Sequence, residues 1–167
     1  RRAQERLWRG LASDELQVVA TDHCPFRMRD QKVLGRDDFT KIPGGVPGIE
    51  TRLSLLFDGG VGGGRFDVQR FVAVTAANPA RIFGLHPRKG VIAPGSDADI
   101  VVFDPDREMT LSAATLHMRV DYSPYEGRVV RGVPELVLSR GRPVVERGTF
   151  VGRPGAGTFL RRSPRPA

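Results

Sequence analysis

The chain has 167 residues, a formal net charge of +7 and 40% hydrophobic residues. A chain of this length ordinarily forms one domain or two small ones, and it is shorter than the roughly 200 residues that a complete eight-stranded α/β barrel needs. No apolar run reaches about 18 residues, so no membrane-spanning helix is expected.

The positive charge comes from 23 Arg and only 3 Lys, most of them scattered singly along the chain, with the densest basic cluster in residues 161–165. Because no nucleic-acid-binding motif accompanies them, we expect neither nucleic acid nor a membrane as a partner. The single cysteine excludes an internal disulfide and fits a reducing compartment. We therefore expect a cytoplasmic protein.

The first third of the chain predicts a helix, a strand and a loop. Apolar residues at helical spacing predict the end of a helix within residues 1–14. Residues 16–20 are mostly apolar and β-branched, which predicts a short buried strand of the kind found in parallel sheets. Residues 24–48 hold three Pro and four Gly and predict a long ordered loop, and loops of that length are usually functional.

Two further helices follow this loop. An apolar face with spacing i, i+4, i+7 and i+8 predicts a helix over residues 48–57, after which the glycine-rich residues 59–64 predict a flexible surface loop. A second helix is predicted over residues 68–77. The pair Asn78-Pro79 is expected to break it, and residues 80–85 add one more turn.

From Lys89 onward, short β-rich runs alternate with Gly, Pro and Asp, which predicts a small sheet or sandwich. The expected strands cover residues 90–92, 99–103, 128–131, 136–138 and 144–146. We therefore divide the chain into a barrel-like part, residues 1–88, a β-sandwich segment, residues 89–160, and a disordered tail, residues 161–167.

The strand predicted over residues 16–20 runs into the motif Thr-Asp-His-Cys-Pro-Phe at residues 21–26. Polar residues at the carboxyl ends of buried strands in α/β folds are where chemistry gathers. Asp22 is the leading candidate, because a carboxylate can ligate a divalent metal and accept a proton from metal-bound water. A buried-strand Asp is also often a helix cap or a salt-bridge partner, and both interpretations stay open.

The other possible metal ligands are weaker candidates. Side chains alternate along a strand, so His23 would point away from Asp22 and Cys24, and Cys24 is expected to be a small buried residue. His86 and His117 are expected at the surface or in packing. Without a His-x-His pair, a His-Glu-x-x-His motif or two CxxC motifs, this chain cannot by itself assemble a complete zinc site.

The glycine-rich segment at residues 41–50 follows the Asp22 motif. Gly44 and Gly45 would allow backbone N–H and C=O groups to approach a small polar ligand closely. The alternative interpretation is a simple turn that leads into the next helix.

Several motifs resemble one family along nearly the whole chain. They lie at residues 21–26, 38–43, 45–52, 78–85, 87–90, 95–101 and 120–127. Asp-His-Cys-Pro-Phe together with Asp-Tyr-x-Pro-Tyr-Glu-Gly is the most specific combination. The sequence is similar to the carboxyl-terminal portion of the dihydropyrimidinases and D-hydantoinases, which are cyclic amidohydrolases.

The resemblance implies an α/β fold: the last strand and helices of an incomplete TIM-like barrel, followed by a small β-rich sandwich region. It also implies that Asp22 ends the last barrel strand, ligates the more buried of two zinc ions and acts as general base. Metal-activated hydroxide would attack the amide carbon of a dihydropyrimidine or hydantoin ring. Asp22 would pass the hydroxide proton to the leaving nitrogen.

In the family, two Zn²⁺ ions are bridged by a carboxylated lysine and held by histidines, and these ligands are absent from this sequence. We therefore expect the 167 residues to be inactive by themselves and to belong with a missing amino-terminal half. The family assembles as tetramers, so a homo-oligomer acting in pyrimidine catabolism is expected.

One departure from the family concerns substrate binding. Family members usually carry Asn at the position of Gly44, and its amide contacts the substrate ring, so ring contacts here would fall to the backbone of Gly44 and Gly45. The alternative function is a non-catalytic pseudoenzyme or an assembly and scaffold protein of the same family.

Overall fold

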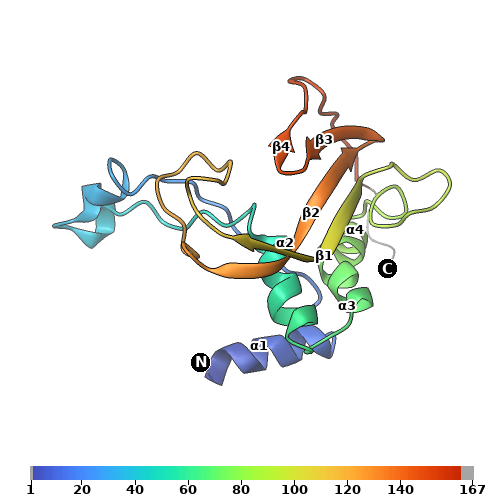
Figure 1. The fold of residues 1–167 in the computed structure, drawn as a ribbon, viewed down its shortest axis with the longest axis horizontal. Helices are drawn as coiled ribbons and strands as arrows, with labels where there is room; N and C mark the ends of the chain where they lie inside the picture. Colours follow the sequence, from blue (N-terminus) through green and yellow to red (C-terminus); the bar gives the residue numbers. More distant parts are fainter. Residues whose placement is uncertain (1, 163–167) are drawn as a thin grey trace.

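The computed structural model describes residues 2–162 and shows a mixed α/β architecture. Helices from the first half of the chain lie below one antiparallel sheet from the second half, and a long loop extends to the left (Figure 1). The disordered tail expected over residues 161–167 falls largely on residues 163–167, which lie outside the described residues. Between residues 2 and 162, no helix has the length and apolar character to cross a membrane.

The amino-terminal helix α1 (Arg2–Ala12) confirms the first predicted element. The second helix, α2 (Arg52–Leu56), begins four residues later than expected and continues into a wider π-helical turn, η3 (Phe57–Gly62). The prediction of a flexible loop at residues 59–64 was therefore wrong over most of its length. The ring of Phe66 packs so closely on Gly60 that a Cβ there would lie 2.1 Å from it, which holds the turn in place.

The third helical segment is continuous through α3 (Val68–Val72), a π-helical turn η4 (Ala73–Ala77) and α4 (Asn78–Ile82). The expected break at Asn78-Pro79 was wrong. Proline lacks an N–H, and in a regular α-helix its ring collides with the carbonyl four residues earlier. The wider turn lies immediately before Pro79 and makes room for that ring, so the helix continues.

No strand forms at residues 16–20, which corrects the prediction made there. The segment has no neighbouring strand within residues 2–162, and helix side chains satisfy its backbone carbonyls instead. These hydrogen bonds run from Arg70 Nη2 to the Leu16 carbonyl (2.9 Å), from Asn78 Nδ2 to the Gln17 carbonyl (3.0 Å) and from Arg52 Nη1 to the Val19 carbonyl (2.6 Å). Burial lowers the pKa of the Arg52 guanidinium, as expected for a charge taken partly out of water.

The sheet has the order β1-β2-β3-β4 and is antiparallel throughout. Its strands are β1 (Ile100–Thr110), β2 (Val129–Ser139), β3 (Arg142–Glu146) and β4 (Thr149–Phe150). The long β1–β2 pairing is irregular between Asp104 and Glu108, where Pro105 has no N–H to donate.

The expected strand at residues 90–92 is absent from the described structure, and β4 was not foreseen. One sheet is present within residues 2–162, so the second layer of a sandwich stays a prediction. The division of the chain into two parts near residue 88 likewise stays a prediction.

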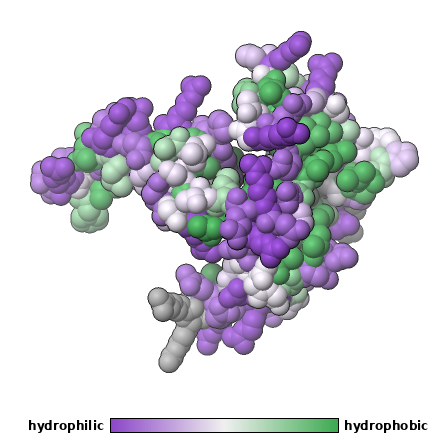
Figure 2. Space-filling model, viewed as in Figure 1, coloured by the Kyte–Doolittle hydropathy of each residue, from purple (hydrophilic) through white to green (hydrophobic). Residues whose placement is uncertain are grey.

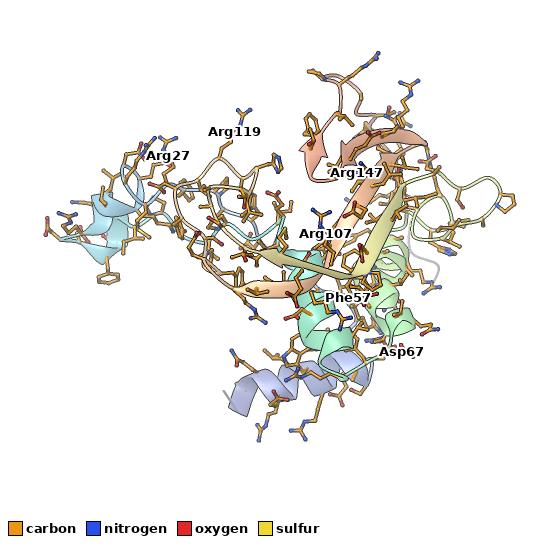
Figure 3. The ribbon with its side chains drawn as sticks, in the orientation of Figure 1. Arg27, Phe57, Asp67, Arg107, Arg119 and Arg147 are labelled. Carbon is orange, nitrogen blue, oxygen red and sulfur yellow. The ribbon has the colours of Figure 1, made fainter. Side chains whose placement is uncertain are left out.

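A shared core joins the helices to the sheet. The rings of Phe57 and Phe71 meet edge to face, with centroids 5.5 Å apart, and Phe103 from β1 packs against both, at 4.9 and 5.8 Å. Figure 3 shows Phe57 at this junction. Leu11, Leu56 and Val74 complete the buried cluster.

Apolar side chains also reach the surface. Figure 2 shows an apolar area over the sheet and the helices behind it. In β1, Val101 and Val102 are 43% and 49% exposed. Because side chains alternate along a strand, these two valines point to opposite faces, so β1 exposes an apolar side chain on each face of the sheet.

Candidate functional site

Asp22 lies in the irregular segment between α1 and the loop, with its side chain exposed. Its φ is +43°, in the left-handed region that residues other than glycine seldom adopt. Four other non-glycine residues of the described chain share a positive φ, namely Asp14, Arg119, Arg140 and Arg147, and Asp adopts this region more readily than most residues. Within residues 2–162, Asp22 caps no helix and takes part in no ion pair, so neither alternative structural role is found there.

The glycine-rich loop packs directly against the Asp22 motif. The Cys24 N–H donates to the Val46 carbonyl at 3.1 Å, and the Cys24 thiol lies 3.3 Å from the Asp22 carbonyl. Gly45 has φ +84°, and a Cβ built there would lie 2.6 Å from both Cβ and Sγ of Cys24. The close approach at this point therefore requires glycine.

Gly44 differs sharply from its neighbour. It is exposed, a Cβ built on it meets no heavy atom within 4 Å, and its φ lies outside the left-handed region. Packing therefore does not require a glycine here, and the space beside the backbone is open. The structure places Gly45 against Cys24 of the Asp22 motif, with Gly44 next to it in the chain, and the roles of both glycines in binding stay predictions.

His23 forms hydrogen bonds with the carboxyl-terminal end of the loop. Its ring is half-buried, and Nδ1 accepts hydrogen bonds from the N–H groups of Gly48 (3.2 Å) and Ile49 (3.4 Å). His23 thus has a structural role in the loop, and its low rank as a metal ligand stays a prediction.

Sequence reasoning missed Lys32. It lies ten residues after Asp22, and its ammonium donates to the carbonyls of Pro43 (2.5 Å) and Gly45 (2.6 Å). The same ammonium lies 5.8 Å from the centre of the Phe26 ring. A lone lysine inside a loop carries no spacing signal, because its partners depend on how the loop folds back.

An oxygen donor such as the Asp22 carboxylate suits a zinc ion. Within residues 2–162, however, no three His, Cys, Asp or Glu side chains lie close enough together to hold one. His117 is occupied elsewhere, since its Nδ1 lies 2.7 Å from Glu50 Oε1. The described residues therefore do not by themselves assemble a metal site.

Known proteins share both the sequence and the fold. The amidohydrolase family model matches residues 1–144. A D-hydantoinase from Streptomyces coelicolor is 54% identical over 160 residues, which cover 96% of this chain and 34% of that protein.

Two solved structures agree with this match, each covering 96% of this chain and 35% of the compared chain. The D-hydantoinase from Bacillus sp. AR9 superposes with a TM-score of 0.93 at 52% identity. The dihydropyrimidinase from Brevibacillus agri NCHU1002 superposes with a TM-score of 0.93 at 51% identity.

This chain thus spans about a third of the length of the relatives it matches. Its motifs, its fold and the family model agree over nearly all of that span. The chain belongs to the amidohydrolase family.

Proposed function

We propose that this chain supplies the Asp22-bearing part of a cyclic amidohydrolase that opens dihydropyrimidine or hydantoin rings. One observation carries the proposal: an exposed carboxylate, Asp22, lies beside a glycine-rich loop in a chain 54% identical to a D-hydantoinase. The relatives support the proposed chemistry, and the exposure of Asp22 supports its proposed role.

Asp22 performs two tasks in this proposal. It holds one zinc ion through its carboxylate, with the remaining ligands coming from parts of a longer polypeptide. Zinc, when bound, supplies the Lewis acidity that makes water a nucleophile at neutral pH. Asp22 takes a proton from the attacking water as the new C–O bond forms at the amide carbon, and it delivers that proton to the ring nitrogen as the C–N bond breaks.

The loop serves substrate binding. Open space at Gly44 leaves room for a planar ring beside the backbone of Gly44 and Gly45. The hydrogen bond from Lys32 to the Gly45 carbonyl holds that part of the backbone in place. The native protein is proposed to be a cytoplasmic homo-oligomer, a tetramer as in its family, acting in pyrimidine catabolism.

A non-catalytic assembly role is the second candidate. Gly44 favours it, because the side chain that contacts the ring in the family is missing. The retention of Asp22 in its motif, in a chain 54% identical to a D-hydantoinase, favours the enzyme.

The test uses a hybrid in which this chain replaces the matching third of the D-hydantoinase from Streptomyces coelicolor. Asn tolerates the left-handed conformation as Asp does, so Asp22→Asn leaves the backbone intact. We expect this change to lower kcat for hydantoin or dihydrouracil by about 10²–10⁴-fold, the range for loss of a general base.

Asp37→Asn is the matched control, because it removes an exposed loop carboxylate in the same way, and it should retain the kcat of the parent hybrid. Near-normal turnover by the Asp22→Asn hybrid would refute the proposed base. A folded but inactive parent hybrid would favour the assembly role.

A further inference from the structure

We infer that one segment of the chain positions another. The connector, residues 111–128 between β1 and β2, would position the candidate substrate loop, residues 24–50, through two carboxylates, Asp121 and Glu50. The inference rests on the proposed function, because it assigns these residues to the loop that would hold the ring. Both are positioning residues and are distinct from the proposed base Asp22. In Figure 1 the connector lies alongside the loop that extends to the left.

Asp121 binds the beginning of the loop with both carboxylate oxygens. Oδ1 accepts the Met28 N–H at 2.7 Å, and Oδ2 accepts the Arg29 N–H at 2.9 Å. Two consecutive N–H groups held by one carboxylate fix both the position and the orientation of that peptide. These bonds, Arg29 first and then Met28, hold the pKa of Asp121 below its ordinary value, so the carboxylate is charged at neutral pH.

Glu50 makes the second contact with the connector, at the end of the loop. Its Oε2 accepts the His117 N–H at 2.6 Å, and its Oε1 lies 2.7 Å from His117 Nδ1. In this case the carboxylate belongs to the loop and the donors to the connector. The two contacts lie at opposite ends of residues 28–50, and both involve one short stretch of the connector, residues 117–121.

The connector itself is fixed to the sheet at its base. The Leu111 N–H donates to the Arg128 carbonyl at 2.9 Å, and the Gly127 N–H donates to the Leu111 carbonyl at 2.8 Å. Leu111 is fully buried. Glu126 Oε2 accepts the Ala113 N–H at 2.8 Å, a hydrogen bond that lies within the connector and does not reach the loop.

Inside the loop, other bonds carry this constraint to the site. The Cys24 amide is bonded to Val46, and the Gly48 amide to His23, and neither touches Asp121. If the connector holds the loop, losing Asp121 should loosen these remote amides. A purely local role would change only the amides of Met28 and Arg29.

The experiment measures hydrogen exchange of the Cys24 and Gly48 amides in the full 167-residue chain. Asp121→Asn and Glu50→Gln should each speed this exchange by about three- to tenfold, the effect of losing a charged hydrogen bond at an exposed site. Glu126→Gln is the matched control, since it removes a connector carboxylate that binds only within the connector, and it should leave these amides unchanged.

Unchanged exchange at Cys24 and Gly48 in both variants would overturn the inference. Equal acceleration by Glu126→Gln would overturn it too, because that result would show general loosening of the connector. The hybrid adds a kinetic readout: Asp121→Asn should raise KM about tenfold with little change in kcat, as expected when a binding loop loses its position.

The outcomes separate the two proposals. If Asp22→Asn keeps its turnover while Asp121→Asn loosens the loop, the proposed function fails and the connector still positions the loop. If Asp22→Asn abolishes turnover and Asp121→Asn changes neither exchange nor KM, the inference fails and the proposed function stands.

Discussion

Gly44 and Gly45 are adjacent residues with opposite structural requirements. Gly45 combines φ +84° with a close approach to Cys24, whereas Gly44 has open space and an ordinary φ. Gly45→Ala should therefore lower the free energy of unfolding by about 1–3 kcal/mol, from backbone strain and overlap with Cys24. Denaturant unfolding measures the effect, with Gly44→Ala as the near-neutral control. Equal stability of the two variants would show that the loop does not need the Gly45 conformation.

The open space at Gly44 allows a test of ring binding. Because a Cβ there meets nothing within 4 Å, Gly44→Asn should fold normally and restore the side chain that the family usually carries. In the hybrid we expect kcat/KM for hydantoin to rise about tenfold, the value of one hydrogen bond to substrate at the upper end of the usual range. A decrease in kcat/KM would mean that the ring does not lie beside residue 44.

At the residue scale the sequence predicted the principal candidates and missed their supports. Asp22, Gly44 and Gly45 lie in motifs whose residue types and spacing indicate a candidate site. Lys32 stands in no motif, and Asp121 opens the Asp-Tyr-x-Pro-Tyr-Glu-Gly motif without any indication of its role, because the partners of both are backbone groups brought near only by the folded loop. Backbone partners leave no trace in side-chain spacing, so these supports could be found only in the structure.

At the level of elements, the predictions were right where local pattern decides and wrong where neighbours decide. The helical stretches and most of the strands follow their apolar spacing. Residues 16–20 have the composition of a buried strand, but a strand needs a neighbour to pair with, and within residues 2–162 there is none. At Asn78-Pro79 the sequence predicted that the helix would break. The π-helical turn before Pro79 makes room for the proline ring, so the helix continues.

Arg70 links the helices to the segment that leads to Asp22. Its guanidinium donates to the carbonyls of Leu11 and Leu16 and pairs with Asp14, and its side chain is only 14% exposed. Arg70→Lys keeps the charge but cannot reach three partners at once. We expect a loss of about 1–3 kcal/mol in the free energy of unfolding.

Arg81→Lys is the control for this change, because Arg81 is exposed and has one long bond, 3.3 Å to Asn78. Denaturant unfolding of the two variants gives the comparison. If Arg70→Lys were as stable as Arg81→Lys, the three bonds of Arg70 would have no net value, and another contact would have to hold this segment.

For the whole molecule, the main fact is that the chain spans about a third of its relatives. One feature of the described residues agrees with that proportion: residues 16–19 have the composition of a buried strand, yet their carbonyls bond to helix side chains and not to a neighbouring strand.

The most direct test compares the rate of hydantoin ring opening by the isolated 167-residue chain and by the hybrid with the Streptomyces coelicolor protein, both with added zinc. We expect hydrolysis by the hybrid and none by the isolated chain, because in the proposed function Asp22 is one part of a site whose other ligands lie elsewhere. Hydrolysis by the isolated chain, or no hydrolysis by a correctly folded hybrid, would contradict it.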